Sequence, residues 1–568
     1  MLIVGIHNTG ITSSAAVVVD GALQFGCAEE RLDRRKYSKY FPHRAISAGL
    51  THVGAKLSDV DVFAIGWNPA INIAEQYRAG FSEWPAHPGA RFYSNANQLL
   101  PRLPQTGFVA TDQVFQREDG TKTRICHVTH HLAHAAAAYF PSGFDEAAIF
   151  SCDGYGERAT TAWYHAQGGK IRLLREIRFP HSIGQFYSAI TQFLGFRPNF
   201  DEWKVMGASA YGNPDVLYDR VKSLIRWTKD AEFELDLRYF RHFDFDAARM
   251  TADLLVDLLG PPREPEVPME QRHFDLAAAL QKVTEEYLFA AVAWLKIRIP
   301  CPNLCLAGGV IMNSVFNGRI ATEGPFERVY VPYAADDSGN SIGAALWAAA
   351  RDGERVDVTA ARTPFVGTVY DDAAIQSQLS AVKISAEKPA DLAAATAGLL
   401  ASGKIVGWFQ GRMEFGQRAL GARSILADPR DAAMKDRINR AVKFREAFRP
   451  FAPAVLAEEA KNWFDMKRPV DAPYMEKVLF VRTDRRQRIP AVVHADGSGR
   501  LQTVDKAMNP IFHRVIEAFG KTTGVPILLN TSFNINNEPI VESPGDAIRT
   551  FYSSGLDALA IGPFLLTK

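Results

Sequence analysis

Short apolar segments that end in a turn containing glycine recur along this chain. Residues 146–152 lead into Asp153-Gly154-Tyr155-Gly156, and residues 303–307 lead into Gly308-Gly309-Val310. Apolar runs of this length, bounded by turn residues and alternating with helices, are typical of buried strands in an α/β fold. The sequence therefore predicts two α/β halves in which polar turns follow the strand ends.

The chain is long enough for two domains, because single hydrophobic cores stop growing near about 250–300 residues. It has 568 residues, and the charged, turn-rich stretch 352–389 precedes a different α/β pattern with apolar segments at 405–409 and 525–529. We therefore predict an N-terminal domain over residues 1–360 and a C-terminal domain over residues 361–568.

Two features subdivide the N-terminal part. Asp20-Gly21 separates apolar segments at 15–19 and 22–28, and this dipeptide predicts a tight β-hairpin. The stretch 214–272 is charged and contains a proline cluster, so we expect inserted helices and loops between the two α/β halves.

Two histidines four residues apart, His130 and His134, lie in the apolar run 128–140. On a helix both imidazoles project from one face, where they can bind one divalent metal ion. Asp153 and Asp337 can add carboxylates from strand ends, and such mixed ligands suit Fe(II), Mn(II) or Zn(II) better than Mg(II). Alternatively, the histidines belong to the surface or core of an alanine-rich helix, and each aspartate forms a turn or caps a helix.

Glycines at three strand ends, in the turns around Gly154, Gly308 and Ser338, suggest nucleotide binding. Glycine lets backbone amides approach a phosphate closely, and the positive N-terminus of a following helix favours the same anion. Two α/β halves with such turns would form a cleft suited to ATP. The alternative is that these glycines serve only the turns.

The C-terminal part contains many cations near small polar residues. The stretch 416–424 includes Arg418 and Arg423, and Lys443, Arg445 and Arg449 follow. Arginine and lysine bind phosphate, whereas Ser532 and Asn534, far downstream, can hold a planar amide. The pattern predicts a small phosphate ester or anhydride with an amide-like group as the ligand. The alternative is a solvated basic helix face.

The amino-acid composition argues against nucleic acid and acidic membranes as partners. Lys and Arg number 64 and Asp and Glu number 63, so the net charge of +1 gives no electrostatic signature of nucleic acid or acidic membrane binding. No apolar stretch approaches the roughly 20 residues of a membrane span, and the N-terminus is predicted to be a strand rather than a signal peptide. The five scattered cysteines fit a reducing cytoplasm.

Taken in order, the motifs resemble the NodU/CmcH-type carbamoyltransferases of nodulation-factor and antibiotic biosynthesis, and the resemblance covers nearly the whole chain. The matching segments are 28–31, 130–134, 153–157, 204–207, 307–310 with Asn313, 337–339, 416–424, 449–453, 530–534 and 538–541.

This resemblance implies an N-terminal domain of the two-lobed actin/sugar-kinase-like (ASKHA) fold and a C-terminal YrdC-like α/β domain. It implies that the C-terminal domain converts carbamoyl phosphate and ATP, with Mg(II), to a carbamoyl-adenylate. The N-terminal domain would then use a metal, expected to be Fe(II) or another divalent ion, to pass the carbamoyl group to a hydroxyl of a small secondary metabolite.

The resemblance also implies roles for individual residues. His130, His134, Asp153 and Asp337 match the metal ligands, and Lys443 and Arg449 match catalytic cations. The expected cofactor-binding residues are Lys36, Gly154, Gly156, Lys204, Gly207, Gly308, Gly309, Val310, Asn313, Arg418, Arg423, Arg445, Ser532 and Asn534.

One position departs from the family pattern. Family members carry a histidine, the expected base for the acceptor hydroxyl, just before the first Ser-Ala-Ala strand, but Ile11 stands in the aligned position here. His7, four residues upstream, is the predicted substitute, and the alternative is a satisfied histidine at a strand end. General-base help is worth about 10²–10⁴ in rate, so an acceptor that is already nucleophilic would manage without it.

Other functions remain alternatives. A tRNA threonylcarbamoyl-type transferase is disfavoured by the near-neutral charge, and a non-catalytic sensor of ATP or carbamoyl phosphate has only Ile11 as support. A hydrogenase-maturation carbamoyltransferase would need paired CxxC zinc motifs, which the sequence lacks. We expect a cytoplasmic enzyme with a small-molecule acceptor, without nucleic acid or membrane, and leave a homodimer open.

Overall fold

The computed structural model describes residues 1–9, 11–69, 110–244, 247–444, 449 and 451–568. The chain divides into two compact units. Unit 1 comprises Met1–Gln24, Gly49–Asn313 and Glu323–Arg362, and unit 2 comprises Phe25–Ala48, Ser314–Thr322 and Thr363–Lys568. Two short segments of the N-terminal part thus group with the C-terminal part. The domain boundary placed after residue 360 stays a prediction.

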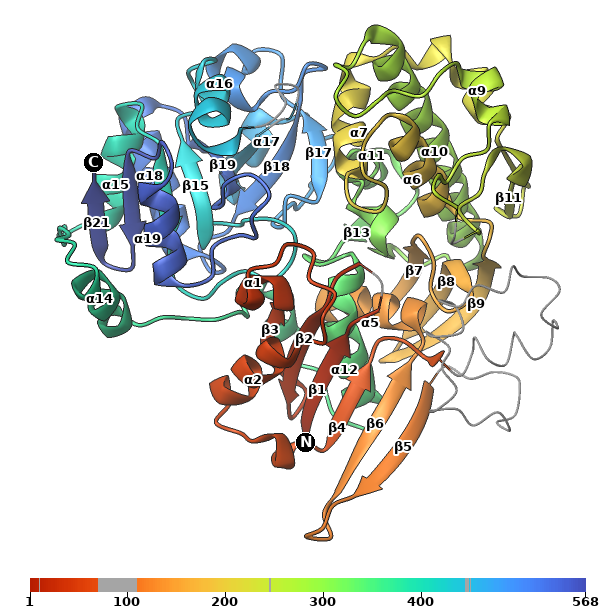
Figure 1. Ribbon diagram of the computed structural model, residues 1–568, viewed down its shortest axis with the longest axis horizontal. Coiled ribbons are helices and arrows are strands. Elements are labelled where there is room, and N and C mark those ends of the chain that lie inside the picture. Colours follow the sequence, from red (N-terminus) through yellow and green to blue (C-terminus); the bar gives the residue numbers. More distant parts are fainter. Residues whose placement is uncertain (10, 70–109, 245–246, 445–448, 450) are drawn as a thin grey trace. The chain divides into compact units, whose positions relative to one another are not determined.

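The first sheet of unit 1 has the order β3-β2-β1-β4-β6-β5 (Figure 1). β1 pairs antiparallel with β2 and parallel with β4, and β4 pairs parallel with β6. The strands are β1 (Leu2–His7), β2 (Ser14–Val19), β3 (Ala22–Ala28), β4 (Val62–Ile65), β5 (Ala110–Gln116) and β6 (Lys122–Val128). The predicted hairpin is confirmed, because Asp20 and Gly21 have φ values of 49° and 77° between β2 and β3.

The second sheet repeats this arrangement with the order β13-β12-β7-β8-β9. β7 pairs antiparallel with β8 and parallel with β12, which pairs parallel with β13. The strands are β7 (Glu146–Cys152), β8 (Ala159–Gln167), β9 (Lys170–Arg178), β12 (Asn303–Ala307) and β13 (Arg328–Tyr330). The second sheet thus has the order third-second-first-fourth-fifth, and the first sheet has the same order when its edge strand β5, which pairs antiparallel with β6, is set aside. This arrangement is that of the actin/sugar-kinase-like fold, so that prediction is confirmed.

Helices α5 (His130–Ser142) and α12 (Asn340–Arg351) pack against each other, and α12 also packs on β1 and β2. Alanine and glycine make this packing close: a Cβ at Gly343 would overlap the carbonyl oxygen of Ala133. The ends of these two helices therefore lie near the strand ends of unit 1. The long helix α10 (Gln271–Arg298) packs against β7 and against α6 (Ile183–Phe193), and much of it is buried.

The predicted insert at 214–272 contains short helices and loops, as expected. Its predicted place between the two α/β halves is wrong, because it lies between β9 and β12, which belong to the same second sheet. It holds α8 (Tyr218–Lys222) and α9 (Leu254–Leu259), and in addition a two-stranded sheet that the sequence did not suggest. That sheet pairs β10 (Ile225–Trp227) with β11 (Phe233–Leu235).

Unit 2 is built on an eight-stranded mixed sheet with the order β17-β18-β16-β19-β15-β14-β20-β21. Its strands are β14 (Val406–Phe409), β15 (Arg423–Ala427), β16 (Ala452–Leu456), β17 (Lys477–Phe480), β18 (Ser498–Val504), β19 (Ile527–Ser532), β20 (Ala558–Ile561) and β21 (Phe564–Thr567). Helices α15 (Leu392–Ala401), α18 (Pro510–Thr523) and α19 (Pro544–Tyr552) pack on it around one apolar core. Both units are therefore α/β, as the fold prediction requires.

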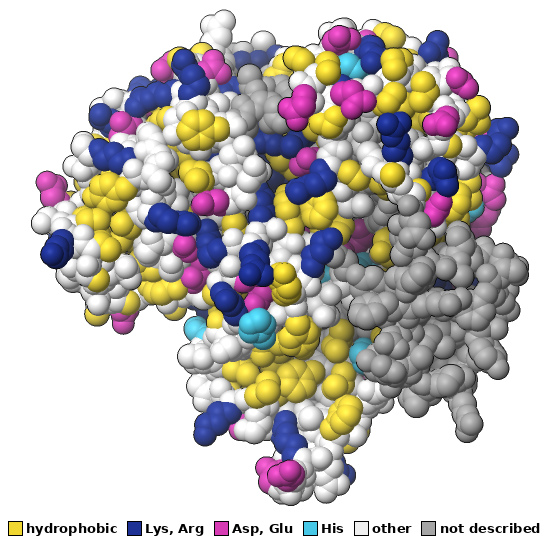
Figure 2. Space-filling view, viewed as in Figure 1, with side chains coloured by type: hydrophobic (Ala, Val, Ile, Leu, Met, Phe, Trp, Pro, Cys, Tyr) yellow, Lys and Arg dark blue, Asp and Glu magenta, His cyan; other side chains and the backbone are white. Residues whose placement is uncertain are grey.

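Among the described residues, the remaining α-helices are α1 (Glu29–Asp33), α2 (His43–His52), α7 (Glu202–Ala208), α11 (Ser314–Glu323), α13 (Val358–Arg362), α14 (Asp372–Ala381), α16 (Met434–Ile438) and α17 (Ala460–Trp463). Among the helices described, none is both long enough and apolar enough to span a membrane. On the face shown in Figure 2, cationic and anionic side chains are interspersed, in keeping with the net charge of +1.

Candidate functional site

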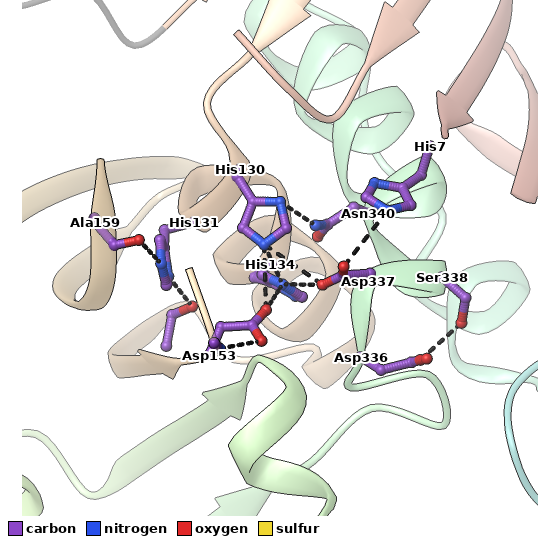
Figure 3. Close-up of polar contacts among 12 residues, drawn as sticks. His7, His130, His131, His134, Asp153, Ala159, Asp336, Asp337, Ser338 and Asn340 are labelled. Atoms are coloured by element: carbon purple, nitrogen blue, oxygen red, sulfur yellow. Dashed lines mark hydrogen bonds and ion pairs between the residues drawn. The ribbon is translucent and has the colours of Figure 1, made fainter. Parts of the chain in front are cut away.

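Two histidines and two aspartates of unit 1 converge at the strand ends. His130 and His134 stand in the first two turns of α5, Asp153 directly follows β7, and Asp337 lies in the turn before α12 (Figure 3). Each residue offers one ligand atom, and these atoms all lie within 4.8 Å of one another. The structure thus brings together the four residues that the sequence predicts as metal ligands.

The distances within this group fit a bound cation. The Nε2 atoms of His130 and His134 are 3.0 Å apart, and they lie 3.2 Å and 2.8 Å from Oδ2 of Asp153. Oδ1 of Asp337 is 3.5 Å and 3.4 Å from the same two nitrogens. Two imidazole nitrogens and two carboxylates, largely removed from water, are a donor set suited to a divalent ion of the Fe(II), Mn(II) or Zn(II) type.

Other contacts fix the orientation of this group. Nδ2 of Asn340 lies 3.2 Å from Nδ1 of His130. Oε1 of the half-buried Glu157 accepts hydrogen bonds from the backbone N–H groups of His130 (2.9 Å) and Asn68 (2.6 Å). A carboxylate at the N-terminus of α5 satisfies one free N–H and interacts favourably with the helix dipole. Glu157 thereby holds the first turn of the helix that carries both histidines.

His131, between the two candidate ligands, has a different environment. Its Nδ1 lies 2.8 Å from Oγ of Ser151 and its Nε2 lies 3.0 Å from the carbonyl oxygen of Ala159. Burial, followed by the neighbouring His130 and His134, lowers its pKa to about 3. Both ring nitrogens are therefore occupied by the protein, and His131 links α5 to the second sheet.

Charge within the group is strongly coupled. Burial opposes a charged His134, but hydrogen bonds to Asp153 and Asp337 outweigh it and raise its pKa to about 9. Burial likewise opposes a charged Asp153, yet hydrogen bonds from His130 and His134 hold its pKa well below the ordinary value. Burial and repulsion by Asp153 raise the pKa of Asp337 to about 6. Without a cation, a proton on His134 thus balances the carboxylates.

These shifts predict a pH-dependent metal affinity. Because His134 must lose its proton before Nε2 can bind an ion, affinity should rise with pH, by up to about tenfold per unit, until the pKa of about 9 is passed. Below about pH 6, the metal affinity should fall more steeply with decreasing pH, because Asp337 also takes up a proton. Chelator-buffered Mn(II) titrations at several pH values from about 5.5 to 8.5 would measure how the metal affinity changes with pH. A flat profile would contradict the coupling.

The proton on His134 also affects the metal-free fold. Since the pKa of His134 is raised in the folded state to about 9, from its ordinary value of 6.5, the stabilisation it contributes is fully present below about pH 6.5. That stabilisation is lost as the pH rises through 9.

The glycines predicted to bind nucleotide lie close to other groups of the chain. A Cβ at Gly309 would lie 2.8 Å from Oδ1 of Asp153, and one at Gly156 would lie 3.1 Å from Cβ of His130. Gly308 has φ 96°, and a Cβ there would overlap the backbone of Cys152. A Cβ at Gly154 would lie 2.9 Å from Nε2 of Gln185. Backbone contacts of the chain therefore require glycine at position 308, and the role of all four glycines in nucleotide binding stays a prediction.

The other nucleotide candidates of unit 1 lie on neighbouring elements. Asn313 is buried, and its Nδ2 donates to Oε1 of Gln281 on α10 (2.9 Å). Val310 is half-buried, in the short helical turn after Gly309. Lys204 and Gly207 are on α7, where the Nζ of Lys204 is 3.1 Å from Oδ2 of Asp201. These positions neither require nor exclude a nucleotide.

His7, the predicted base, is buried at the end of β1. Its Nε2 lies 3.7 Å from Oδ2 of Asp337, the carboxylate oxygen that faces away from His130 and His134 (Figure 3). Burial, followed by the charges of His130 and His134, lowers the pKa of His7 to about 3. The ring is therefore neutral at physiological pH, although a base with so low a pKa takes up a proton only weakly. Its catalytic role stays a prediction.

In unit 2, Lys443 meets the turn that ends β19. Its Nζ lies 2.6 Å from the carbonyl oxygen of Ser532 and 2.9 Å from that of Asn534, and it also contacts both side-chain oxygens, at 3.2 Å and 2.7 Å. Lys443 ends a π-helical turn, Asn439–Lys443, and π-turns are frequent at functional sites. The structure thus brings together three predicted residues, Lys443, Ser532 and Asn534.

The predicted arginines have different surroundings. Arg449 is buried shortly before β16, Arg418 is half-buried, and Arg445 lies outside the described residues. The guanidinium of Arg423 is fully buried 3.6 Å from the centre of the Phe409 ring, and its Nη1 donates to the carbonyl oxygen of Gln410 (3.0 Å). Burial lowers its pKa to about 10. Arg423 therefore supports the 410–423 loop, and these contacts give no support for binding a ligand.

Lys36 lies in the N-terminal segment that belongs to unit 2. It is exposed, with Nζ 5.5 Å from the centre of the Tyr37 ring. In the same segment, Arg34 donates to the carbonyl oxygens of Ile540 (2.6 Å) and Pro539 (3.0 Å), and Arg31 donates to that of Gly416 (3.0 Å). The segment is thereby fastened to two of the predicted ligand-binding loops.

Sequence reasoning assigned no role to Asn340, Glu157 or Glu414. Oε1 of Glu414 accepts N–H groups of Leu420 (2.7 Å), Ala422 (3.2 Å) and Arg423 (3.2 Å), so it shapes the glycine-rich loop of unit 2. Glu157 lies within the segment 153–157, and Asn340 directly follows the segment 337–339, both of which the sequence did single out. Their position in or next to a turn that carries a predicted ligand could have indicated a role for them.

Comparison with known proteins defines the class. The fold places the protein among actin/sugar-kinase-like proteins that carry an additional α/β part. Residues 2–346 match the model of the carbamoyltransferase N-terminus and residues 397–568 match that of the carbamoyltransferase C-terminus. The chain belongs to the carbamoyltransferase family, and it is accordingly a transferase.

Relatives extend over the whole chain. The uncharacterized protein sll1178 of Synechocystis sp. is 36% identical, over 100% of this chain and 96% of its own length. Nodulation protein NolNO of Sinorhizobium fredii is 37% identical, over 99% of this chain and 80% of its own. Component A of the Acidaminococcus fermentans (R)-2-hydroxyglutaryl-CoA dehydratase has a TM-score of 0.32 at 12% identity, over 61% of this chain and 97% of that chain, and this likeness is too low to add to the fold assignment.

Proposed function

We propose that this protein is an ATP-dependent carbamoyltransferase that activates carbamoyl phosphate as carbamoyl-adenylate and transfers the carbamoyl group to a hydroxyl of a small secondary metabolite. The observation that carries the proposal is the buried His–Asp group of unit 1. A member of the carbamoyltransferase family that keeps two imidazoles and two carboxylates within 4.8 Å of one another is equipped for metal-assisted transfer.

Activation is assigned to unit 2. The charge of Lys443 and the guanidinium of Arg449 can hold phosphate oxygens, while Ser532 and Asn534 can hydrogen-bond the carbamoyl amide. Ligand binding would redirect the Nζ hydrogens of Lys443 from the turn oxygens to the ligand. The buried position of Lys443 strengthens such a contact, because little water competes with it.

The chemistry balances in three steps. Water cleaves carbamoyl phosphate to carbamate and inorganic phosphate. A carbamate oxygen attacks the α-phosphorus of ATP, so carbamoyl-adenylate forms and pyrophosphate leaves. The acceptor oxygen then attacks the carbamoyl carbon, its proton passes to a base, and AMP leaves.

Transfer is assigned to unit 1. His130, His134, Asp153 and Asp337 would hold a divalent ion, which supplies Lewis-acid stabilisation of negative charge on substrate oxygens. Asp337 faces this group with Oδ1, while its Oδ2 lies toward His7. His7 is accordingly the nearest candidate among these residues to take the acceptor proton.

Product analysis tests the proposal. Incubation of the full chain with ATP, carbamoyl phosphate, Fe(II) or Mn(II) and a panel of hydroxyl metabolites should give one or more products that carry the mass of a carbamoyl group, with AMP and pyrophosphate as co-products. Products that form equally without ATP, or ATP consumption to ADP alone, would contradict it.

A further inference from the structure

The side chain of Asn340 is placed where it can decide which nitrogen of His130 carries the ring hydrogen. Asn340 is the first residue of α12 and is fully buried. Its Nδ2 is 3.2 Å from Nδ1 of His130, the ring nitrogen opposite the one that faces the carboxylates (Figure 3). Oδ1 of the same amide is buried and, among the described residues, has no hydrogen-bond partner.

This contact has two forms. If Nδ2 donates to Nδ1, the ring hydrogen is on Nε2, which then donates to Oδ2 of Asp153 at 3.2 Å. An imidazole that binds an ion through Nε2 must instead carry its hydrogen on Nδ1, and Nδ1–H then needs an acceptor. The first form suits the metal-free protein, and only the second suits a bound ion.

A carboxamide can serve both forms. Its oxygen and nitrogen are nearly the same size, so a half-turn of the amide places Oδ1 where Nδ2 stood. Oδ1 would then accept from Nδ1–H, and a buried atom now without a partner would gain one. Asn340 is closely packed at its Cβ, because a Cβ at Gly66 would lie only 2.9 Å from Cβ of Asn340.

We propose that Asn340 is a positioning residue for the metal centre: its amide reverses when a divalent ion binds, and so stabilises the Nδ1–H tautomer of His130. The inference rests on the proposed function, since it takes His130 as a ligand. His134 offers a contrast, because its Nδ1 is buried and has no hydrogen-bond partner among the described residues. His130 is therefore the histidine of the pair whose ring tautomer a neighbouring side chain can set.

Substitutions that preserve shape separate this role from packing. Asn340→Asp keeps an acceptor beside Nδ1, whereas Asn340→Leu has nearly the same shape and offers none. We expect Asn340→Leu to weaken Co(II) affinity by about 10–100-fold and Asn340→Asp to stay near the wild type or bind more tightly. Ser341→Ala is the matched control, because Ser341 is also buried on α12 but bonds to Ser14 and Ser338.

The measurement is Co(II) affinity of the full chain by chelator competition, followed by visible absorption, with the unfolding temperature of each metal-free variant. If Asn340→Leu does not fold, Asn340→Ser, whose shorter side chain falls short of the ring, takes its place with the same expected loss. Wild-type affinity in Asn340→Leu or Asn340→Ser, or equal losses in the leucine and aspartate variants, would overturn the inference. A wild-type protein that binds no Co(II) would instead contradict the proposed metal centre.

Discussion

Replacing Lys443 with alanine should lower carbamoyl-phosphate-dependent pyrophosphate release by at least about 10²–10³-fold, the loss typical when one charge-stabilising donor is removed from an active site. Lys443 is buried and its Nζ lies within 3.2 Å of four oxygens of Ser532 and Asn534. The alanine variant lacks the positive charge that Lys443 places beside the turn formed by Ser532 and Asn534. Initial rates of pyrophosphate release measure the effect.

A matched surface lysine separates this loss from a general effect of charge. Lys404 belongs to the same unit, is half-exposed and lies 3.7 Å from Asp557, so Lys404→Ala should release pyrophosphate within about twofold of the wild-type rate. Lys443→Ala should still bind metal, because its substitution leaves the His–Asp group untouched. Wild-type pyrophosphate release from Lys443→Ala would remove the assignment of activation to unit 2.

Asp153→Asn should weaken the metal affinity by more than about 100-fold. This loss exceeds the one usually seen when a residue that hydrogen-bonds a metal ligand is removed. Oδ2 of Asp153 contacts Nε2 of both histidines, at 2.8 Å and 3.2 Å, so the substitution removes the charge at the centre of the group without changing side-chain size. Carbamoyl transfer should fall with the bound metal, while pyrophosphate release should persist.

Elemental analysis and Mn(II) titration measure the first effect, and product formation measures the second. Asp145→Asn is the control, because Asp145 is an exposed aspartate just before the opposite end of β7. Full metal content in Asp153→Asn would show that the ligand set is wrong. Loss of pyrophosphate release together with metal would contradict the division of labour between the units.

Local sequence patterns predict the strands well, and they also predict that two histidines and two aspartates converge, whereas metal binding by this group stays a prediction. The alternation of apolar runs with turns locates β7 and β12, and the spacing of His130 and His134 places both on one face of α5. These features depend on residues close in sequence. In α/β folds, the turns that follow the strand ends carry the polar residues that bind ligands. Asp153 and Asp337 stand in such turns, so the sequence could place them near the histidines.

Long-range packing escapes such reasoning. Nothing in the residues 25–48 indicates that Arg31 donates to the carbonyl oxygen of Gly416, 385 positions away. Sequence also does not distinguish a cation that binds a ligand from one that binds carbonyl oxygens, as Arg423 does. Likewise, Gly309 suggests phosphate binding by its motif, whereas its neighbour in space is the carboxylate of Asp153.

Isotope exchange between pyrophosphate and ATP in the metal-free protein tests the central claim most directly. Reversible adenylation of the carbamoyl group requires label to pass from pyrophosphate into ATP when carbamoyl phosphate is present, with no metal at the His–Asp group and no acceptor. We predict exchange that depends on carbamoyl phosphate and disappears in Lys443→Ala. Exchange that proceeds without carbamoyl phosphate, or none in its presence while carbamoylated product still forms, would contradict an adenylate made in unit 2.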